Sequence, residues 1–422
     1  MLKLLRWLAL AGLLAGCAGG PTAEPPTAER LAASPSPSPA PLSATPEPEP
    51  AAAGLRVWMP PELAPEAEPG GPELTAQLAE FAATAGQPAQ VRVKAAAGPG
   101  GLLESLIAAY HAAPDALPDV IALPCGDLET PAALGAVLPL DDRLPAALQA
   151  DAYPFARTLG QAAGHWYGVP FAVDARVLVF NAATYATPPL RWSEVLTGTL
   201  IFPGAEPDGL TLLSDYLAGG PLLDEAGRPR LEATRLAASL AALRDLAQAG
   251  RLPLSTLDYA DPAATWQVFR ERRAGLALTS ASWFLREAGR VAGAAAAAPP
   301  TTRGVPFTLA EGWCWALVNA GRDPQAAAGL VAWLMTPARH GAWTLAAGVL
   351  PAAPAALAEW HAAPAVPLAA EVLTRAEARP GPALLAAAGP LLRRAWEDVL
   401  NGRATPEAAA AAAAQSLADQ QP

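Results

Sequence analysis

The sequence predicts an α/β protein with two sheet-containing lobes and a ligand cleft between them. Two stretches, residues 55–123 and 192–297, each alternate short apolar strands with helices, which is typical of parallel sheets with right-handed crossovers. Between them lies Gly164–Asn181, whose apolar run Val177–Phe180 has the length and composition of a buried strand. After one more strand, Trp313–Asn319, the chain is predicted to be helical, and the alanine run Ala408–Ala414, which has no large side chains to pack, is expected to be a frayed terminal helix. We therefore expect two α/β lobes followed by a helical C-terminal region.

The first stretch also predicts where a ligand would bind. Its strands are expected at Leu55–Trp58, Gln90–Ala95 and Pro118–Leu123. In open parallel sheets, ligands bind beyond the carboxyl ends of the strands. Those ends are Met59–Leu63 and Pro124–Glu129, so these two segments are expected to face a binding site.

A secretory signal occupies residues 1–17. Lys3 and Arg6 precede the apolar segment Trp7–Leu14, which is too short to span a bilayer. Leu14-Ala15-Gly16-Cys17 matches the bacterial lipobox, in which cleavage leaves a cysteine that is acylated. An ordinary cleaved signal with a chance cysteine is the alternative. We expect a mature protein held outside the cytoplasmic membrane by lipid on Cys17.

A proline-rich tether is expected to follow. Residues 18–53 contain ten prolines and no aromatic residue, a composition that cannot bury enough apolar surface to fold. The folded part therefore begins near Gly54 and comprises about 370 residues. That length exceeds what a single core normally supports, which again indicates two lobes.

Composition and motifs exclude several classes of function. A net charge of −11 argues against nucleic acid and against anionic lipid as primary partners. The sequence lacks a Gly-x-Ser-x-Gly elbow, a P-loop, a Gly-x-Gly-x-x-Gly fingerprint and a His-Glu-x-x-His motif, and its four histidines are scattered. No later apolar run is long enough for a transmembrane helix. We expect a protein that is not an enzyme, with no cofactor and no metal site.

Two charges stand out within the central stretch. Asp174 and Arg176 immediately precede the buried run, where a strand covered on both faces should carry no charge. A charge in such a place needs a partner or an open cleft. The stretch is therefore predicted to cross between the lobes and to line the gap between them.

An ordered series of motifs through residues 54–420 resembles a known family. The chain is similar to the extracellular solute-binding proteins of ABC importers, specifically the carbohydrate-associated, maltodextrin-binding-protein-like group. The matching segments are Leu55–Trp58, Pro118–Ile121, Leu138–Asp141, Tyr167–Pro170, Val179–Asn181, Trp192–Val195, Gly275–Thr279 with Trp283, Gly312–Asn319, Ala332–Thr336 and Leu400–Glu407.

The resemblance implies a periplasmic-binding-protein-like fold, in which hinge crossings join the lobes and the ligand is trapped by hinge closure. The implied N-terminal lobe comprises 54–173 and 306–422, including the C-terminal helices. The implied C-terminal lobe comprises 174–305.

The same resemblance implies two carboxylates in the binding site. Asp174 corresponds to a carboxylate that accepts hydrogen bonds from sugar hydroxyls; pairing with Arg176 at the hinge is the alternative. Glu206, followed by Pro207, resembles a second sugar-contacting carboxylate. Its alternative is a solvated loop glutamate, since Asp208-Gly209 replaces the aromatics expected beside it.

Aromatic ligand contacts are implied as well. Trp283 begins a helix at the position of a sugar-stacking aromatic, with a core tryptophan as the alternative. Trp313 lies at the return crossing and is expected to reach the cleft, whereas Trp315 is expected in the core. Trp58 and Tyr167 are lesser candidates for ligand binding.

The family pattern also implies a disulfide and a changed ligand. The returning strand should run antiparallel beside the third strand, bringing Cys125 near Cys314; two buried thiols are the alternative. The family's aromatics are replaced by Leu123-Pro124-Cys125 and by Ala386–Gly389. A small sugar, or a non-sugar with polar groups, is therefore favoured over a long maltodextrin.

The expected function is that of a lipid-anchored substrate-binding protein of an ABC transporter. It would act as a monomer, capture a small polar solute such as a carbohydrate, and deliver it to the transmembrane subunits of a permease. One alternative is a binding module that feeds a membrane sensor. Another is a lipid-anchored glycoside hydrolase in which Asp174 and Glu206 act as the carboxylate pair.

Overall fold

A computed structural model describes residues 54–420 of the chain. The predicted signal peptide, the acylated Cys17 and the tether of residues 18–53 lie outside the described residues. Within residues 54–420, no helix combines the length and apolar character needed to cross a membrane.

The predicted α/β fold is confirmed, and nine of its strands form one continuous sheet, whose main path has the order β2-β1-β3-β10-β6-β8-β7; β4 and β5 form a separate two-stranded sheet. At one end, β1 (Leu55–Met59) pairs in parallel with β2 (Ala89–Val93) and with β3 (Val120–Pro124). The connecting helices α1 (Gly71–Ala85) and α2 (Leu102–Ala112) complete the predicted alternation of strands and helices. The carboxyl ends of β1 and β3 therefore lie at one edge of this part of the sheet.

Two long strands carry the sheet onward. β6 (Val169–Asn181) runs antiparallel to β10 (Thr308–Leu317) through Ala175, and from Arg176 onward it pairs with other strands. The predicted buried strand at Val177–Phe180 is confirmed, but it is the second half of a longer strand, and it is antiparallel to its neighbours β8 and β9. β10 also runs antiparallel beside β3, as the family pattern implied.

At its other end the sheet contains β7 (Leu200–Ile201), β8 (Leu276–Ser280) and β9 (Ala294–Ala297), with β9 paired to β6. The helices of this region are α6 (Leu210–Leu217), α7 (Ala233–Gln248), α8 (Pro262–Arg270) and α9 (Ala281–Glu287). Short elements complete the first half of the chain: α3 (Glu129–Ala133), α4 (Ala146–Asp151), α5 (Pro154–Leu159), β4 (Gln161–Ala162) and β5 (His165–Trp166).

The C-terminal region is largely helical, as predicted, with one added strand. Its elements are α10 (Pro324–Leu334), α11 (Pro337–Ala347), α12 (Pro354–Ala358), α13 (Val366–Arg375), β11 (Ala376–Ala378), α14 (Pro382–Leu400) and α15 (Pro406–Asp419). β11 was not predicted; it adds to β10 in parallel, over three residues that are too few to show a strand pattern.

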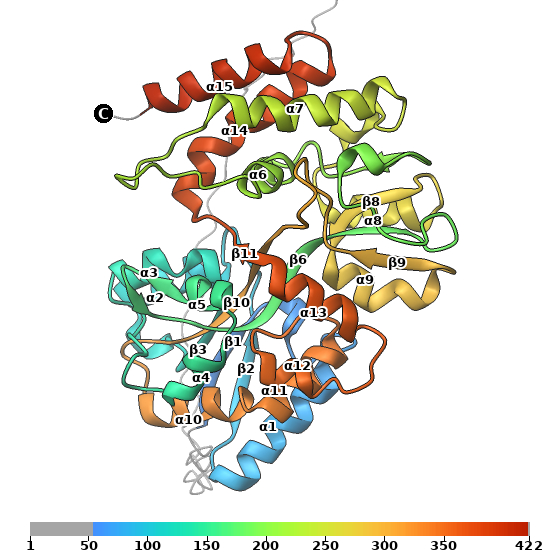
Figure 1. The fold of residues 1–422 in the computed structure, drawn as a ribbon. Coiled ribbons are helices and arrows are strands. Elements are labelled where there is room, and N and C mark those ends of the chain that lie inside the picture. Colours follow the sequence, from blue (N-terminus) through green and yellow to red (C-terminus); the bar gives the residue numbers. More distant parts are fainter. Residues whose placement is uncertain (1–53, 421–422) are drawn as a thin grey trace, which may run out of the picture. The chain divides into compact units, whose positions relative to one another are not determined.

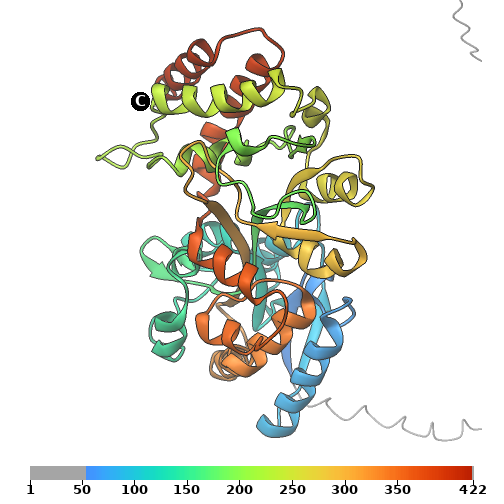
Figure 2. The same cartoon turned by 45° about the vertical axis from the view of Figure 1, so that its right-hand side comes forward.

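The last two helices pack where the sequence did not place them. α15 lies along α7, and α14 contacts α6, α7 and α15 (Figures 1 and 2). The expectation of a frayed terminal helix is wrong: Ala410 and Leu417 are buried, and the small alanine side chains allow α15 to approach α7 closely. These helices share a hydrophobic core with Leu236 and Leu278. This packing differs from the predicted assignment of all of 306–422 to the N-terminal lobe.

Candidate functional site

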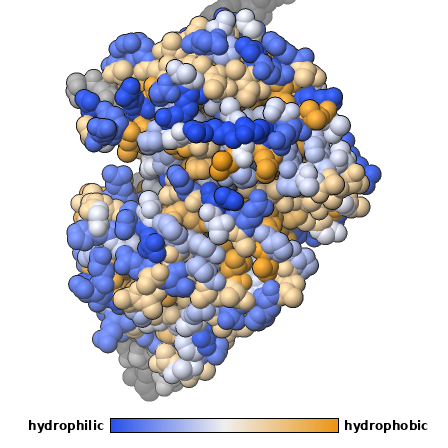
Figure 3. All heavy atoms as spheres, in the orientation of Figure 1, coloured by the Kyte–Doolittle hydropathy of each residue, from blue (hydrophilic) through white to orange (hydrophobic). Residues whose placement is uncertain are grey.

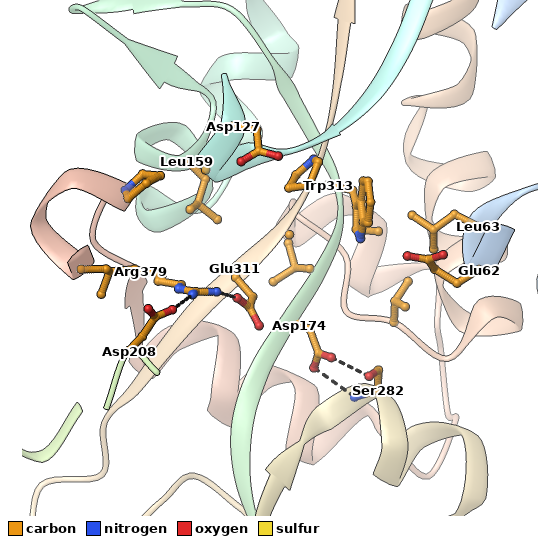
Figure 4. Close-up of a pocket in the computed structure, with 18 of the residues that line it drawn as sticks. Glu62, Leu63, Asp127, Leu159, Asp174, Asp208, Ser282, Glu311, Trp313 and Arg379 are labelled. Carbon is orange, nitrogen blue, oxygen red and sulfur yellow. Dashed lines mark hydrogen bonds and ion pairs between the residues drawn. The ribbon is translucent and has the colours of Figure 1, made fainter. Parts of the chain in front are cut away.

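A cavity of about 610 Å³ lies where β6 and β10 run side by side (Figure 4). Such a volume is in the range of small-molecule binding sites. In the space-filling view, the surface is hollowed on its left side, between the region of α6 and α14 and that of α2 and α3 (Figure 3). The lining residues discussed below are Glu62, Leu63, Pro124, Asp127, Asp174, Asp208, Ser282, Arg286, Glu311, Gly312, Trp313 and Arg379.

A β-bulge shapes the wall formed by the two long strands. Trp313 pairs with Ala172, but the next residue, Cys314, pairs with Pro170, so Phe171 has no partner on β10. Pro170 has no N–H to give to the ladder, which favours an irregularity at this point. Gly312 is needed here, since a Cβ atom on it would lie 2.4 Å from the carbonyl oxygen of Ala172. Bulges of this kind re-aim side chains next to binding sites.

Asp174 lines the cavity and is held in place by the protein. Its Oδ1 accepts hydrogen bonds from the backbone N–H groups of Ala175 (2.8 Å) and Ser282 (3.1 Å), and its Oδ2 accepts one from the Ser282 hydroxyl (2.5 Å). Burial raises the pKa of Asp174, while the hydrogen bonds from Ser282 oppose that rise. Asp174 therefore neither pairs with Arg176 nor stands free of the protein. Its carboxylate is held by hydrogen bonds from Ser282 on α9.

Arg379 joins two carboxylates on one side of the cavity. It donates hydrogen bonds to Glu311 on β10 and to Asp208 in the loop before α6, as the dashed lines in Figure 4 show. Burial alone would lower the pKa of Arg379, but Glu311 and Asp208 outweigh that effect and raise it. The guanidinium is therefore charged, and its two terminal nitrogens donate to these two carboxylates.

Three further charged residues line the cavity without such close pairing. Arg286 donates from Nε to the Ala347 carbonyl oxygen (2.8 Å), and its terminal nitrogens have no hydrogen-bond partner within residues 54–420. Glu62 and Asp127 line the cavity with no side-chain hydrogen bond to any described residue. Burial raises the pKa of Asp127, and the negative charge of the nearby Glu104 raises it further.

Glu206 does not face this cavity in the structure. It forms a buried ion pair with Arg176, in which Glu206 is 7% and Arg176 9% exposed. Burial raises the pKa of Glu206, and the Arg176 guanidinium opposes that rise. Pairing of Arg176 with Asp174 was the alternative to ligand contact by Asp174; in the structure Arg176 pairs with Glu206 instead. Because Asp174 and Glu206 do not share a cavity, they are not placed as a glycosidase pair.

Of the predicted aromatics, the structure brings only Trp313 to the cavity. Trp283, on α9, is partly buried against the core and is not among the lining residues. Tyr167 is also partly buried against the core and outside the cavity lining. Trp58 is 4% exposed, and the Lys94 ammonium lies 4.4 Å from its ring centroid. Trp315 is buried, as expected.

A disulfide lies behind the cavity wall. Cys125 and Cys314 are bonded, linking the end of β3 to β10 across 189 residues of sequence. Their neighbours Pro124 and Trp313 both line the cavity and are paired in the antiparallel ladder. The disulfide thus connects two walls of the site.

Several lining residues were not predicted individually. Glu62 and Asp127 lie in the two segments after β1 and β3 that the strand-end rule had indicated, but neither residue had been singled out. Arg286 and Arg379 come from α9 and from the loop after β11, with no local pattern that marks them. Within the described part of the chain, no group of three or more His, Cys, Asp or Glu residues could hold a metal ion.

The comparisons with known proteins agree with this architecture. A family model described as bacterial extracellular solute-binding protein matches residues 76–368. This match covers more than half of the chain, and the protein belongs to that family of extracellular binding proteins. No curated protein sequence matches the chain significantly.

Solved structures are similar in fold at low sequence identity. The cyclic α-maltosyl-1,6-maltose binding protein of Arthrobacter globiformis has a TM-score of 0.71 at 20% identity, covering 86% of this chain and 97% of that one. The sugar-binding protein MalE of Xanthomonas citri has a TM-score of 0.69 at 21% identity, covering 87% and 98%. A ribitol complex of a solute-binding protein of an Agrobacterium radiobacter ABC transporter has a TM-score of 0.64 at 22% identity, covering 87% and 98%.

Proposed function

We propose that this protein captures a carbohydrate or a similar polyol in the cavity beside β6 and β10 and delivers it to an ABC permease. The observation that carries the proposal is the cavity itself, in which the indole of Trp313 lies among charged hydrogen-bonding groups. An aromatic face suits the C–H face of a sugar ring, and carboxylate and guanidinium groups suit its hydroxyls. The names of the similar structures, which bind maltose-type sugars and ribitol, support the same ligand class.

The residues have distinct roles in this proposal. Trp313 stacks on the ligand, and Asp174 accepts hydrogen bonds from it while Ser282 fixes the carboxylate. Arg286 offers donors that no described residue uses. Glu206 supports the hinge side of the site through Arg176 rather than contacting ligand. The proposed lobes are 54–173 with 306–381, and 174–305 with α14 and α15, which pack against α6 and α7. They close over the ligand by bending of β6 and β10.

A thermal-shift screen tests the ligand class. The panel contains monosaccharides, disaccharides, oligosaccharides and sugar alcohols, followed by amino acids and polyamines. A ligand at 100 times its Kd stabilises the fold by about 2.7 kcal/mol, which corresponds to a rise in Tm of about 3 °C for some 370 residues. A shift with amino acids or polyamines and with no carbohydrate or sugar alcohol would reject the proposed class.

The proposed lipid anchor is tested separately. Cells that express the full chain are fed labelled palmitate, and the wild type is compared with the Cys17→Ser variant. Label on the wild type alone supports acylation of Cys17. An unlabelled wild type that is released into the medium would contradict the anchor without affecting the binding proposal.

A further inference from the structure

The charges around the cavity do not balance. Its lining contains five carboxylates but two guanidinium groups and no lysine. Those carboxylates are Glu62, Asp127, Asp174, Asp208 and Glu311. A neutral sugar would leave this excess of negative charge in a partly enclosed space, where it is poorly screened by water and salt.

The ion pairs within the cavity leave the excess negative charge on the carboxylates that have no cationic partner. Arg379 donates to both Glu311 and Asp208, and although its charge acts on Asp127 it forms no ion pair or hydrogen bond with that carboxylate. Arg286 makes no ion pair with any described residue, although Asp174 and Glu62 are near enough to act on its charge. Asp127 has neither a hydrogen bond nor an ion pair within residues 54–420, and it is half-buried on the cavity wall. Asp127 is therefore the carboxylate with the most to gain from a cationic partner.

The aromatic lining adds a second and independent feature that suits a cation. Trp313 lies in the same cavity as the carboxylates, and Figure 4 shows Asp127 and Glu62 on either side of it. The face of an indole attracts a cation by its quadrupole, and more strongly where water is excluded. Apolar residues such as Leu63 and Leu159 supply the dry surroundings.

We propose that the ligand carries a protonated amine, which binds between Asp127 and the face of Trp313. Taken with the proposed function, on which this inference rests, the substrate class is an aminated sugar or polyol. Arg286 and Asp174 then serve the hydroxyl groups. The net charge of the loaded site comes closer to zero than it would with any neutral carbohydrate.

Matched sugars test the charge directly. Calorimetry below pH 7, where the amine is protonated, compares glucosamine with glucose and N-acetylglucosamine, and the β-1,4-linked glucosamine disaccharide with cellobiose. We expect the amine-bearing member of a set to bind at least about tenfold more tightly than the neutral ones. Equal or tighter binding of the neutral sugars would overturn the inference and leave the carbohydrate proposal standing.

A variant and its control locate the effect. Asp127→Asn should weaken binding of the amine-bearing sugar at least about tenfold and remove its advantage over the neutral one. Glu129→Gln makes the same change in charge at an exposed residue that does not line the cavity, and should leave affinity within about twofold. An Asp127→Asn variant that folds like the wild type and keeps the full preference would refute the role of Asp127.

Two other outcomes separate the inference from the proposed function. Binding of spermidine or putrescine, with no sugar bound at all, would support the cationic ligand and reject the carbohydrate class. Failure of every amine and every sugar to bind would overturn both.

Discussion

Replacement of Glu206 by Gln should destabilise the fold far more than it changes ligand recognition. The Arg176–Glu206 pair is buried, with about a tenth of each side chain exposed. Arg176 Nη1 and Glu206 Oε2 already lack hydrogen-bond partners, so neutralising Glu206 leaves the buried guanidinium without its ion-pair partner. Breaking one side of a buried ion pair costs about 3–5 kcal/mol. At about 2.1 cal/mol/K per residue, a loss of 4 kcal/mol lowers the Tm of some 370 residues by about 5 °C.

Thermal and denaturant unfolding of three proteins checks this prediction. Wild type and Glu206→Gln give the cost of breaking the pair. The double variant Arg176→Met, Glu206→Leu replaces both charges by apolar side chains, and it should recover most of the lost stability. A Glu206→Gln protein within about 1 kcal/mol of wild type would refute the reasoning. If that same variant kept its stability but failed to bind the ligand, Glu206 would be a binding residue, as the family resemblance first implied.

Three further predictions concern the core, the disulfide and the strand crossing. Burial lowers the pKa of His340 to about 4, so as the pH falls the unfolded chain takes up a proton on this residue before the folded protein does. The free energy of unfolding is therefore fully present above pH 6.5 and falls by about 3 kcal/mol as the pH drops to 4. Unfolding of His340→Gln should show a correspondingly weaker pH dependence. Removing the disulfide by Cys125→Ala with Cys314→Ala should cost about 2–5 kcal/mol, and reductant should lower the Tm of the wild type but not of this variant. Gly312→Ala should lower the free energy of unfolding by about 1–3 kcal/mol and weaken ligand binding, because the added Cβ meets the Ala172 carbonyl. Gly381→Ala is the control, since Gly381 has open space around it. Equal effects in both variants would contradict the close approach of β6 and β10.

The sequence predicted the parts of the site that have local signals. Asp174 stood out as a charge inside an apolar run, and it does line the cavity. The segments after β1 and β3 were indicated because ligands bind beyond the ends of parallel strands. Trp313 was expected at the cavity from its place at the return crossing, and the structure puts it there.

What the sequence could not show depends on contacts between distant residues. Arg176 pairs with Glu206 thirty residues away rather than with Asp174, which is two residues away and accepts hydrogen bonds from Ala175 and Ser282. Arg379 reaches Glu311 and Asp208 across 68 and 171 residues, and nothing in its own segment indicates either partner. Only the packed chain determines which of several carboxylates meets a given guanidinium.

Side-chain size explains a further failure. The alanine-rich segment of α15 offered no large apolar residues, so it was expected to fray. In the fold its alanines form a closely packed contact with α7, with Ala410 fully buried. Burial of many small side chains and close backbone approach are not visible in a count of large hydrophobic residues.

The most direct test of the central claim compares two tryptophans in one binding experiment. Calorimetry with the best ligand of the screen is performed on Trp313→Ala and on Trp283→Ala, and both variants are first shown to fold. Because Trp313 lines the cavity and Trp283 does not, Trp313→Ala should lose at least about tenfold in affinity while Trp283→Ala stays close to wild type. Unchanged affinity in Trp313→Ala together with loss of binding in Trp283→Ala would place the ligand elsewhere and contradict the account.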